Sequence, residues 1–128
     1  MNFGYFCNTT NWDKKPYTQL LDEAREITEY CDQNNWNSIW YTEHHFNHEG
    51  MESCTNPLMM GADIAARTKK IKIGQACNVI TFHNPIRLAE DIAFLDFFCF
   101  KKVITLLNKA IHNSSLNSKI YESGIGRL

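Results

Sequence analysis

The sequence predicts an α/β fold built of parallel βα units, and three observations support this prediction. Short apolar runs recur about every 33 residues, and each is followed by a polar loop and an amphipathic helical segment. Each helical segment opens at a proline. No G-x-G-x-x-G fingerprint follows the first run, which favours the first half of a (β/α)8 TIM barrel over an open doubly wound sheet.

The first unit begins with a strand over Phe3–Cys7. Its helix opens at Pro16, because proline loses no hydrogen bond at a helix start. The pair Asn34–Asn35 is expected to end this helix. The apolar positions between these limits have the three-four spacing of a helix that covers a core with one face, and they are Leu20, Leu21, Ala24, Ile27 and Cys31.

The second and third units repeat this pattern. The second has a strand over Ser38–Thr42 and a helix that begins at Asn56–Pro57, since asparagine is a favoured N-cap and proline a favoured first helical residue. The third has a strand over Ile71–Ala76 and a helix that begins at Asn84–Pro85. Consecutive parallel strands of this kind require right-handed crossovers through the helices.

The last part of the chain departs from this order. Val103, Leu107, Ala110 and Ile111 are spaced to extend or start a helix, and Ile120–Ile125 is predicted as a fourth strand. We therefore expect one partial barrel domain over residues 1–128 with about four parallel βα units, because a whole barrel needs about 250 residues.

Composition excludes several classes of protein. The net charge is −1 and the basic residues are dispersed, so no nucleic-acid surface is predicted. Five cysteines without a C-x-x-C pair favour reduced thiols in a cytoplasmic protein. The first residues lack a signal-peptide pattern, and no apolar run approaches the roughly 20 residues of a membrane span.

The candidate site is the stretch from Trp40 to Gly50. An apolar strand runs there directly into Glu43, His44 and His45, which is typical of a buried strand that surfaces into a pocket. Histidines beside a carboxylate can donate, accept or bind a metal near neutral pH. The alternative is a polar loop whose histidines only bind their neighbours.

Several motifs occur in one order across residues 1–96. They are Trp40-x-x-Glu43-His44-His45-Phe46, Asn56-Pro57, Ala65-Ala66-x-Thr68-x-x-Ile71-x-Ile73-Gly74, His83-Asn84-Pro85-Ile86-Arg87 and Ala89-Glu90-Asp91-x-Ala93-x-Leu95-Asp96. In these motifs the sequence resembles the bacterial luciferase-like flavin monooxygenases. Residues 97–128 diverge from that family, although Gly124-Ile125-Gly126-Arg127 resembles the glycine-arginine end of its fourth strand.

The resemblance implies a TIM barrel oxidoreductase, a monooxygenase that uses reduced flavin mononucleotide (FMN) and O2 on an organic substrate such as an aldehyde. A deazaflavin, F420, is the alternative cofactor, because some members of the family use one. The resemblance further implies a flavin reductase that supplies the reduced flavin and a dimer formed through barrel helices. Since a barrel needs about 250 residues, the chain is expected to be a truncated fragment of such an enzyme.

The resemblance also assigns site residues. His44 is the candidate acid-base group at the flavin edge, and Glu43 orients it or pairs with a nearby base. Ala76–Cys77 lies where the family often has a non-proline cis peptide under the flavin ring. Arg127 is the candidate contact of the flavin phosphate, because a guanidinium matches phosphate oxygens in a bidentate way. No metal ligand is assigned.

Two other functions stay open at this point. His44 and His48 are four residues apart with Glu43 beside them and with Glu49 and Glu52 close by, so a metal-dependent hydrolase is conceivable. The other is a non-catalytic truncated module that binds flavin or dimerises, for which the small residues of 61–66 offer a close helix contact.

Overall fold

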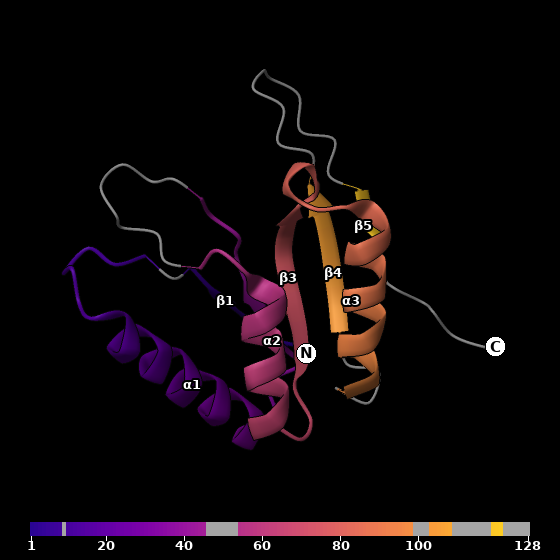
Figure 1. Cartoon of the computed structure of the whole chain (residues 1–128). Helices are drawn as coiled ribbons and strands as arrows, with labels where there is room; N and C mark the ends of the chain where they lie inside the picture. Colours follow the sequence, from indigo (N-terminus) through magenta and orange to yellow (C-terminus); the bar gives the residue numbers. More distant parts are fainter. Residues whose placement is uncertain (9, 46–53, 99–102, 109–118, 122–128) are drawn as a thin grey trace.

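The computed structural model describes residues 1–8, 10–45, 54–98, 103–108 and 119–121. Figure 1 shows the helices on one side of the sheet. No helix in these ranges is long and apolar enough to cross a membrane. The elements in chain order are β1 (Gly4–Cys7), α1 (Tyr17–Gln33), β2 (Ser38–Tyr41), α2 (Pro57–Arg67), β3 (Lys72–Val79), the 3-10 helix η1 (Ile80–Phe82), α3 (Pro85–Phe98), β4 (Val103–Asn108) and β5 (Lys119–Tyr121).

The strands lie in the order β1-β2-β3-β4-β5, which is also their order along the chain. The strands β1, β2, β3 and β4 pair with one another in parallel, and β5 pairs with β4 in the antiparallel direction. The predicted α/β fold with parallel strands is therefore confirmed. Strand, helix and strand alternate through the first three units, because each helix carries the chain back to the amino end of the sheet.

Two predictions for the last part of the chain were wrong. The helix expected from Val103 onward is the parallel strand β4, Val103–Asn108. The run Val-Ile-Thr is β-branched, and β-branched residues favour a strand over a helix even where their spacing also suits a helix. The segment Ile120–Ile125, expected as the fourth parallel strand, overlaps the antiparallel β5, Lys119–Tyr121, and its remainder lies outside the described residues.

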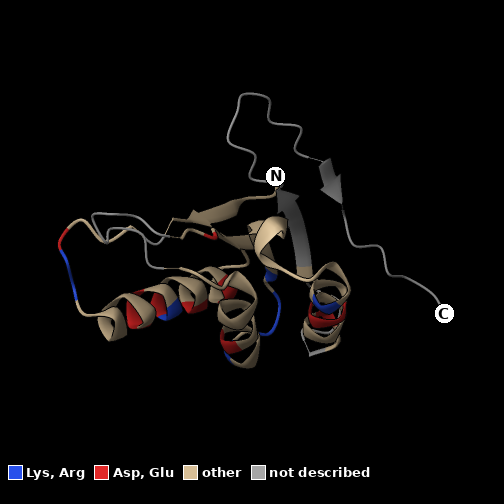
Figure 2. Ribbon diagram, turned by 45° about the horizontal axis from the view of Figure 1, so that its top comes forward, with Lys and Arg blue, Asp and Glu red and all other residues tan. Residues whose placement is uncertain are grey.

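The core lies between the sheet and the helix layer. Ile39, Tyr41 and Ile73 point from the strands into this layer and are 0–1% exposed. Because side chains alternate along a strand, Phe6 and Trp40 lie on the opposite face, where Phe6 is 58% exposed. Figure 2 shows that the charged residues gather on the helices and loops rather than on the described strands.

The predicted starts of α2 and α3 are confirmed by their caps, whereas α1 begins at Tyr17, one residue after the predicted Pro16. The Asn56 side chain accepts a hydrogen bond from the Met59 N–H at 3.0 Å, and the Asn84 side chain accepts one from the Ile86 N–H at 3.0 Å. Each proline follows its cap at the first helical position, where its missing N–H costs nothing. These caps fix where each chain segment leaves the carboxyl end of the sheet.

A buried carboxylate joins α1 to the start of β3. Asp32, 9% exposed, accepts hydrogen bonds from the backbone N–H groups of Lys69 at 3.0 Å, Lys70 at 2.7 Å and Ile71 at 2.7 Å. Charge-assisted hydrogen bonds of this length are strong. They hold the turn before β3, and so set the register of that strand.

Candidate functional site

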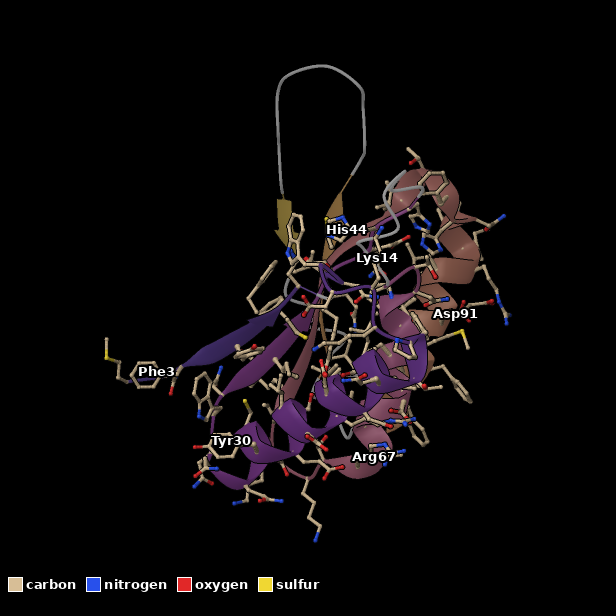
Figure 3. The ribbon with its side chains drawn as sticks, turned by 90° about the vertical axis from the view of Figure 1, so that its left-hand side faces the viewer. Phe3, Lys14, Tyr30, His44, Arg67 and Asp91 are labelled. Atoms are coloured by element: carbon tan, nitrogen blue, oxygen red, sulfur yellow. The ribbon has the colours of Figure 1, made fainter. Side chains whose placement is uncertain are left out.

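The candidate site lies at the carboxyl ends of β2 and β3. Glu43 and His44 follow β2, and the Ala76–Cys77 bond lies within the last residues of β3. Figure 3 shows His44 at the end of the molecule away from Tyr30 and Arg67. Because both strands run in one direction, their carboxyl ends open at the same edge of the sheet.

Glu43 is the centre of this edge. Its side chain is fully buried, and its two oxygens make four hydrogen-bond contacts with three groups, the Val79 N–H and the imidazoles of His45 and His83. Oε2 accepts from the Val79 N–H at 2.8 Å, and Oε1 lies 2.6 Å from Nε2 of His45. Nε2 of His83 lies 3.2 Å from Oε1 and 3.5 Å from Oε2. One carboxylate thus connects the end of β2 to the end of β3.

The structure gives Glu43 partners that the sequence analysis did not name. The base next to Glu43 is His45, and a second imidazole comes from His83, which lies 40 residues after Glu43 in the chain. The spacing of residues along the sequence does not show that His83 lies beside Glu43, although His83 is the first residue of the motif His83-Asn84-Pro85. His44 is half-buried, and its backbone N–H donates to the Cys54 carbonyl at 2.9 Å.

The end of β3 has an irregular backbone. The Ala76–Cys77 peptide bond is cis, as the resemblance implies, and the pairing with β4 shifts between Ala76 and Asn78. Ala76 and Cys77 are half-buried. Asn78 is fully buried, and among the described residues neither of its side-chain polar atoms has a hydrogen-bond partner. A buried amide in this state is suited to a water or a polar ligand group.

Buried thiols lie close to this edge. Burial raises the pKa of the Cys54 thiol to about 11, and the neighbouring Glu43 carboxylate adds to the effect. Burial likewise raises the pKa of the Cys7 thiol to about 11. Both thiols are therefore neutral near pH 7, and neither competes with Glu43 as an anion or acts as a ready nucleophile.

The residues at this edge fit a planar, weakly polar ring. The strand ends at 7–8, 42–45 and 76–79, which hold the half-buried His44, Ala76 and Cys77, contain no lysine or arginine of their own. Such an edge suits the ring of a flavin better than its phosphate. Arg127, the residue expected to contact the phosphate, lies outside the described residues.

The residues expected to complete a metal site, His48, Glu49 and Glu52, also lie outside the described ranges. Within those ranges, no group of three or more His, Cys, Asp or Glu side chains could hold a metal ion. The Glu43 cluster is a hydrogen-bonded group, in which Nε2 of His45 and Nε2 of His83 each face a carboxylate oxygen.

Comparison with known proteins extends the resemblance. The sequence model of the luciferase-like monooxygenases matches residues 1–98. The alkanal monooxygenase beta chain of Photorhabdus luminescens is 38% identical over 97 residues, which are 75% of this chain and 29% of that protein.

Two solved structures share the fold. Monooxygenase RslO1 of Streptomyces bottropensis has a TM-score of 0.75 at 25% identity, over 84% of this chain and 32% of its own. The oxygenating constituent of 3,6-diketocamphane monooxygenase from Pseudomonas putida, in complex with FMN, has a TM-score of 0.77 at 19% identity. The match covers 84% of this chain and 29% of that protein. The described residues therefore have the fold of the first βα units of these proteins.

Proposed function

The chain belongs to the luciferase-like monooxygenase family, and from this membership we propose that it forms the flavin-binding edge of a flavin-dependent monooxygenase. The observation that supports the proposal is the convergence of Glu43, His44 and the Ala76–Cys77 segment at the carboxyl ends of two parallel strands. The chain spans 29% of the length of the alkanal monooxygenase beta chain, so the activity is proposed for the protein of which this edge is a part.

The residues of this edge have distinct roles in the proposal. Ala76 and Cys77 contact the flat ring, because both are half-buried and neither carries a bulky side chain. His44 holds or moves a proton at the ring edge, since an imidazole exchanges protons near neutral pH. Glu43 positions its neighbours from its buried place. Arg127 binds the flavin phosphate.

We propose reduced FMN as the cofactor, with F420 as the alternative. A bound reduced flavin supplies the activation of O2, so that one oxygen atom goes to an organic substrate such as an aldehyde. The similar protein from Pseudomonas putida is described as an oxygenating constituent, which supports a separate flavin reductase as the partner that supplies reduced flavin.

We also propose that two copies pair through α2 and α3. A groove of about 420 Å³ lies between these helices, and it is bordered by Met59 (72% exposed) and Phe94 (64% exposed). Exposed apolar side chains beside a groove are typical of an interface. Light scattering of the 128-residue chain is expected to give the mass of a dimer, and a monomer at all concentrations would contradict the pairing.

The test of the cofactor is a titration of the chain with FMN and with F420 under the same conditions, followed by flavin fluorescence. We expect FMN fluorescence to change on binding and His44→Ala to weaken the binding. Lys70→Gln, at the opposite end of the sheet, is the matched control and should bind as the wild type does. If neither flavin binds to a folded chain, the proposal is wrong for this chain.

A second candidate is a non-catalytic module that binds flavin or dimerises. It is favoured by the sheet face that the helices leave uncovered, where Phe6 is 58% exposed. The discriminating measurement is aldehyde oxidation with chemically reduced FMN and O2. A chain that binds FMN and produces no acid supports the module, whereas acid formed in proportion to the chain supports the enzyme.

A further inference from the structure

The Glu43 carboxylate is surrounded by groups that donate hydrogen bonds. The Val79 backbone N–H can only donate, and it lies 2.8 Å from Oε2. Nε2 of His45 and Nε2 of His83 face Oε1 at 2.6 Å and 3.2 Å. A carboxylate can only accept hydrogen bonds. Each Nε2 must then carry a hydrogen.

The neighbouring Cys54 thiol does not add a second negative charge to this arrangement. The Cys54 thiol lies close enough to respond to the Glu43 charge, and its burial keeps it protonated. The cluster therefore has one negative charge and two imidazoles whose hydrogens are both directed at it. In a neutral imidazole with its hydrogen on Nε2, the other nitrogen, Nδ1, is the proton acceptor.

His83 reaches the cluster from a rigid turn. It follows η1, and its own N–H donates to the Ile80 carbonyl at 3.2 Å. The preceding residue, Phe82, places its ring against His45, with ring centroids 4.7 Å apart. The turn thus contacts His45 directly through Phe82 and indirectly through His83 and Glu43. Its position is set by the Asn84 cap of α3 immediately after it.

We propose that His83 is a positioning residue of the flavin edge. Its Nε2 hydrogen holds the Glu43 carboxylate, and Glu43 in turn holds His45 with its hydrogen on Nε2 and its acceptor on Nδ1. The inference rests on the proposed function only for the identity of the ligand at this edge. The hydrogen-bonded arrangement itself belongs to the chain.

Two variants of equal polarity separate this role from simple packing. In His83→Gln the side-chain amide N–H can occupy the place of Nε2 and still donate to Glu43. In His83→Asn the same amide is one methylene shorter and falls short of the carboxylate, since it matches the place of Nδ1. Arg87→Gln is the control, because the Arg87 side chain is 73% exposed on α3 and contacts only Glu90 and Asp91 in the hydrogen bonds and ion pairs described.

The tautomers are measured by long-range proton–nitrogen spectra of the full 15N-labelled chain, with His45 assigned through His45→Gln. We expect His45 to carry its hydrogen on Nε2 in the wild type, in His83→Gln and in Arg87→Gln. His83→Asn removes the hydrogen bond that holds the Glu43 carboxylate in its place towards His45, so the carboxylate can turn away from His45 and we expect a mixture of both His45 tautomers. His45 protonated on Nδ1 in the wild type would overturn the proposal, and so would an unchanged tautomer in a folded His83→Asn variant.

FMN titration of the same samples separates this inference from the proposed function. We expect His83→Asn to weaken FMN binding by about tenfold, the lower end of the effect that the loss of an outer hydrogen-bond partner has at metal sites, and His83→Gln to retain it. If the wild type shows the expected His45 tautomer but binds no flavin, the proposed function is overturned and the positioning role stays intact. Flavin binding with the wrong tautomers would overturn the positioning role alone.

Discussion

Asp32 and Glu43 are two buried carboxylates that each accept hydrogen bonds from three groups, at opposite ends of the same sheet. The described donors to the Asp32 carboxylate are the backbone N–H groups of Lys69, Lys70 and Ile71. Glu43 has one backbone donor and two imidazoles. A backbone N–H keeps its proton at every ordinary pH, whereas an imidazole gains or loses one near neutrality.

The difference separates a structural carboxylate from a functional one. The described hydrogen bonds of Asp32 stabilise one backbone conformation, the turn into β3, and their donors do not change protonation. Two of the three described partners of Glu43 are imidazole side chains, which can exchange protons while the backbone keeps its place. Burial and hydrogen-bond number are alike at the two sites, so the chemistry of the donors is what distinguishes them.

The largest expected effect is on stability at Asp32. Asp32→Ala removes the carboxylate that accepts from three backbone N–H groups, of which the Ile71 N–H is buried and those of Lys69 and Lys70 are partly buried, and we expect the free energy of unfolding to fall by about 3 kcal/mol. Urea unfolding followed by circular dichroism measures this change. Asp32→Asn keeps one acceptor oxygen and should lose less. A loss below about 1 kcal/mol in Asp32→Ala would show that the turn holds without the carboxylate.

The same comparison shows what the sequence could predict. The three βα units followed from the apolar runs and the Asn-Pro helix starts, because these signals are local and agree with the fold. The strand at Val103–Asn108 was missed, since its apolar spacing suits a helix and its β-branched residues suit a strand. Residues 109–118, between β4 and β5, lie outside the described ranges.

The candidate site was predictable only in part. Glu43, His44 and the Ala76–Cys77 segment were named from motifs that surround two strand ends. The bond between Glu43 and His83 spans 40 residues, and it depends on β2 and β3 pairing in parallel and on the turn at η1. A sequence pattern does not specify which of several histidines will reach a buried carboxylate, because that is decided by the register of the strands.

The next largest effect for a single side chain is a loss of stability at alkaline pH, and it is expected from the buried thiols near the Glu43 end of the sheet. Burial raises the pKa values of Cys7 and Cys54 from 9.0 to about 11, so the unfolded chain loses these thiol protons first. Their contribution to stability is complete below pH 9 and is lost as the pH rises towards 11, by about 2 kcal/mol for each thiol. Urea unfolding at several pH values tests this.

The control for the alkaline series is Cys7→Ala, which removes one of the titrating thiols. Burial also raises the pKa values of Cys31 and Tyr41, so the decline in the free energy of unfolding of Cys7→Ala between pH 9 and 11 should be less steep than in the wild type but should not vanish. An equal decline in both proteins would contradict the assignment of the effect to these thiols.

A smaller effect on stability is expected at Glu43. Glu43→Gln replaces one acceptor oxygen by an amide that donates, and this amide opposes one of the three donors. An imidazole can move its hydrogen to the other nitrogen and then accept, so we expect a loss of only about 1 kcal/mol. Urea unfolding measures the loss, and proton–nitrogen spectra should show the changed tautomer. A loss as large as that of Asp32→Ala would mean that Glu43 is structural as well.

The smallest effect is expected at an exposed carboxylate, Asp22, which sets the lower limit of the comparison. Its side chain is 64% exposed and accepts from Nη1 of Arg25 at 3.1 Å. Arg25 is also held by two hydrogen bonds to Asp63, at 2.8 and 2.9 Å, so it keeps its place when Asp22 is changed. Water replaces an exposed acceptor at little cost, and we expect the urea midpoint of Asp22→Asn to match that of the wild type. A clear decrease in the urea midpoint would mean that the negative charge itself stabilises this chain, and that burial and fixed donors do not decide how much a carboxylate contributes.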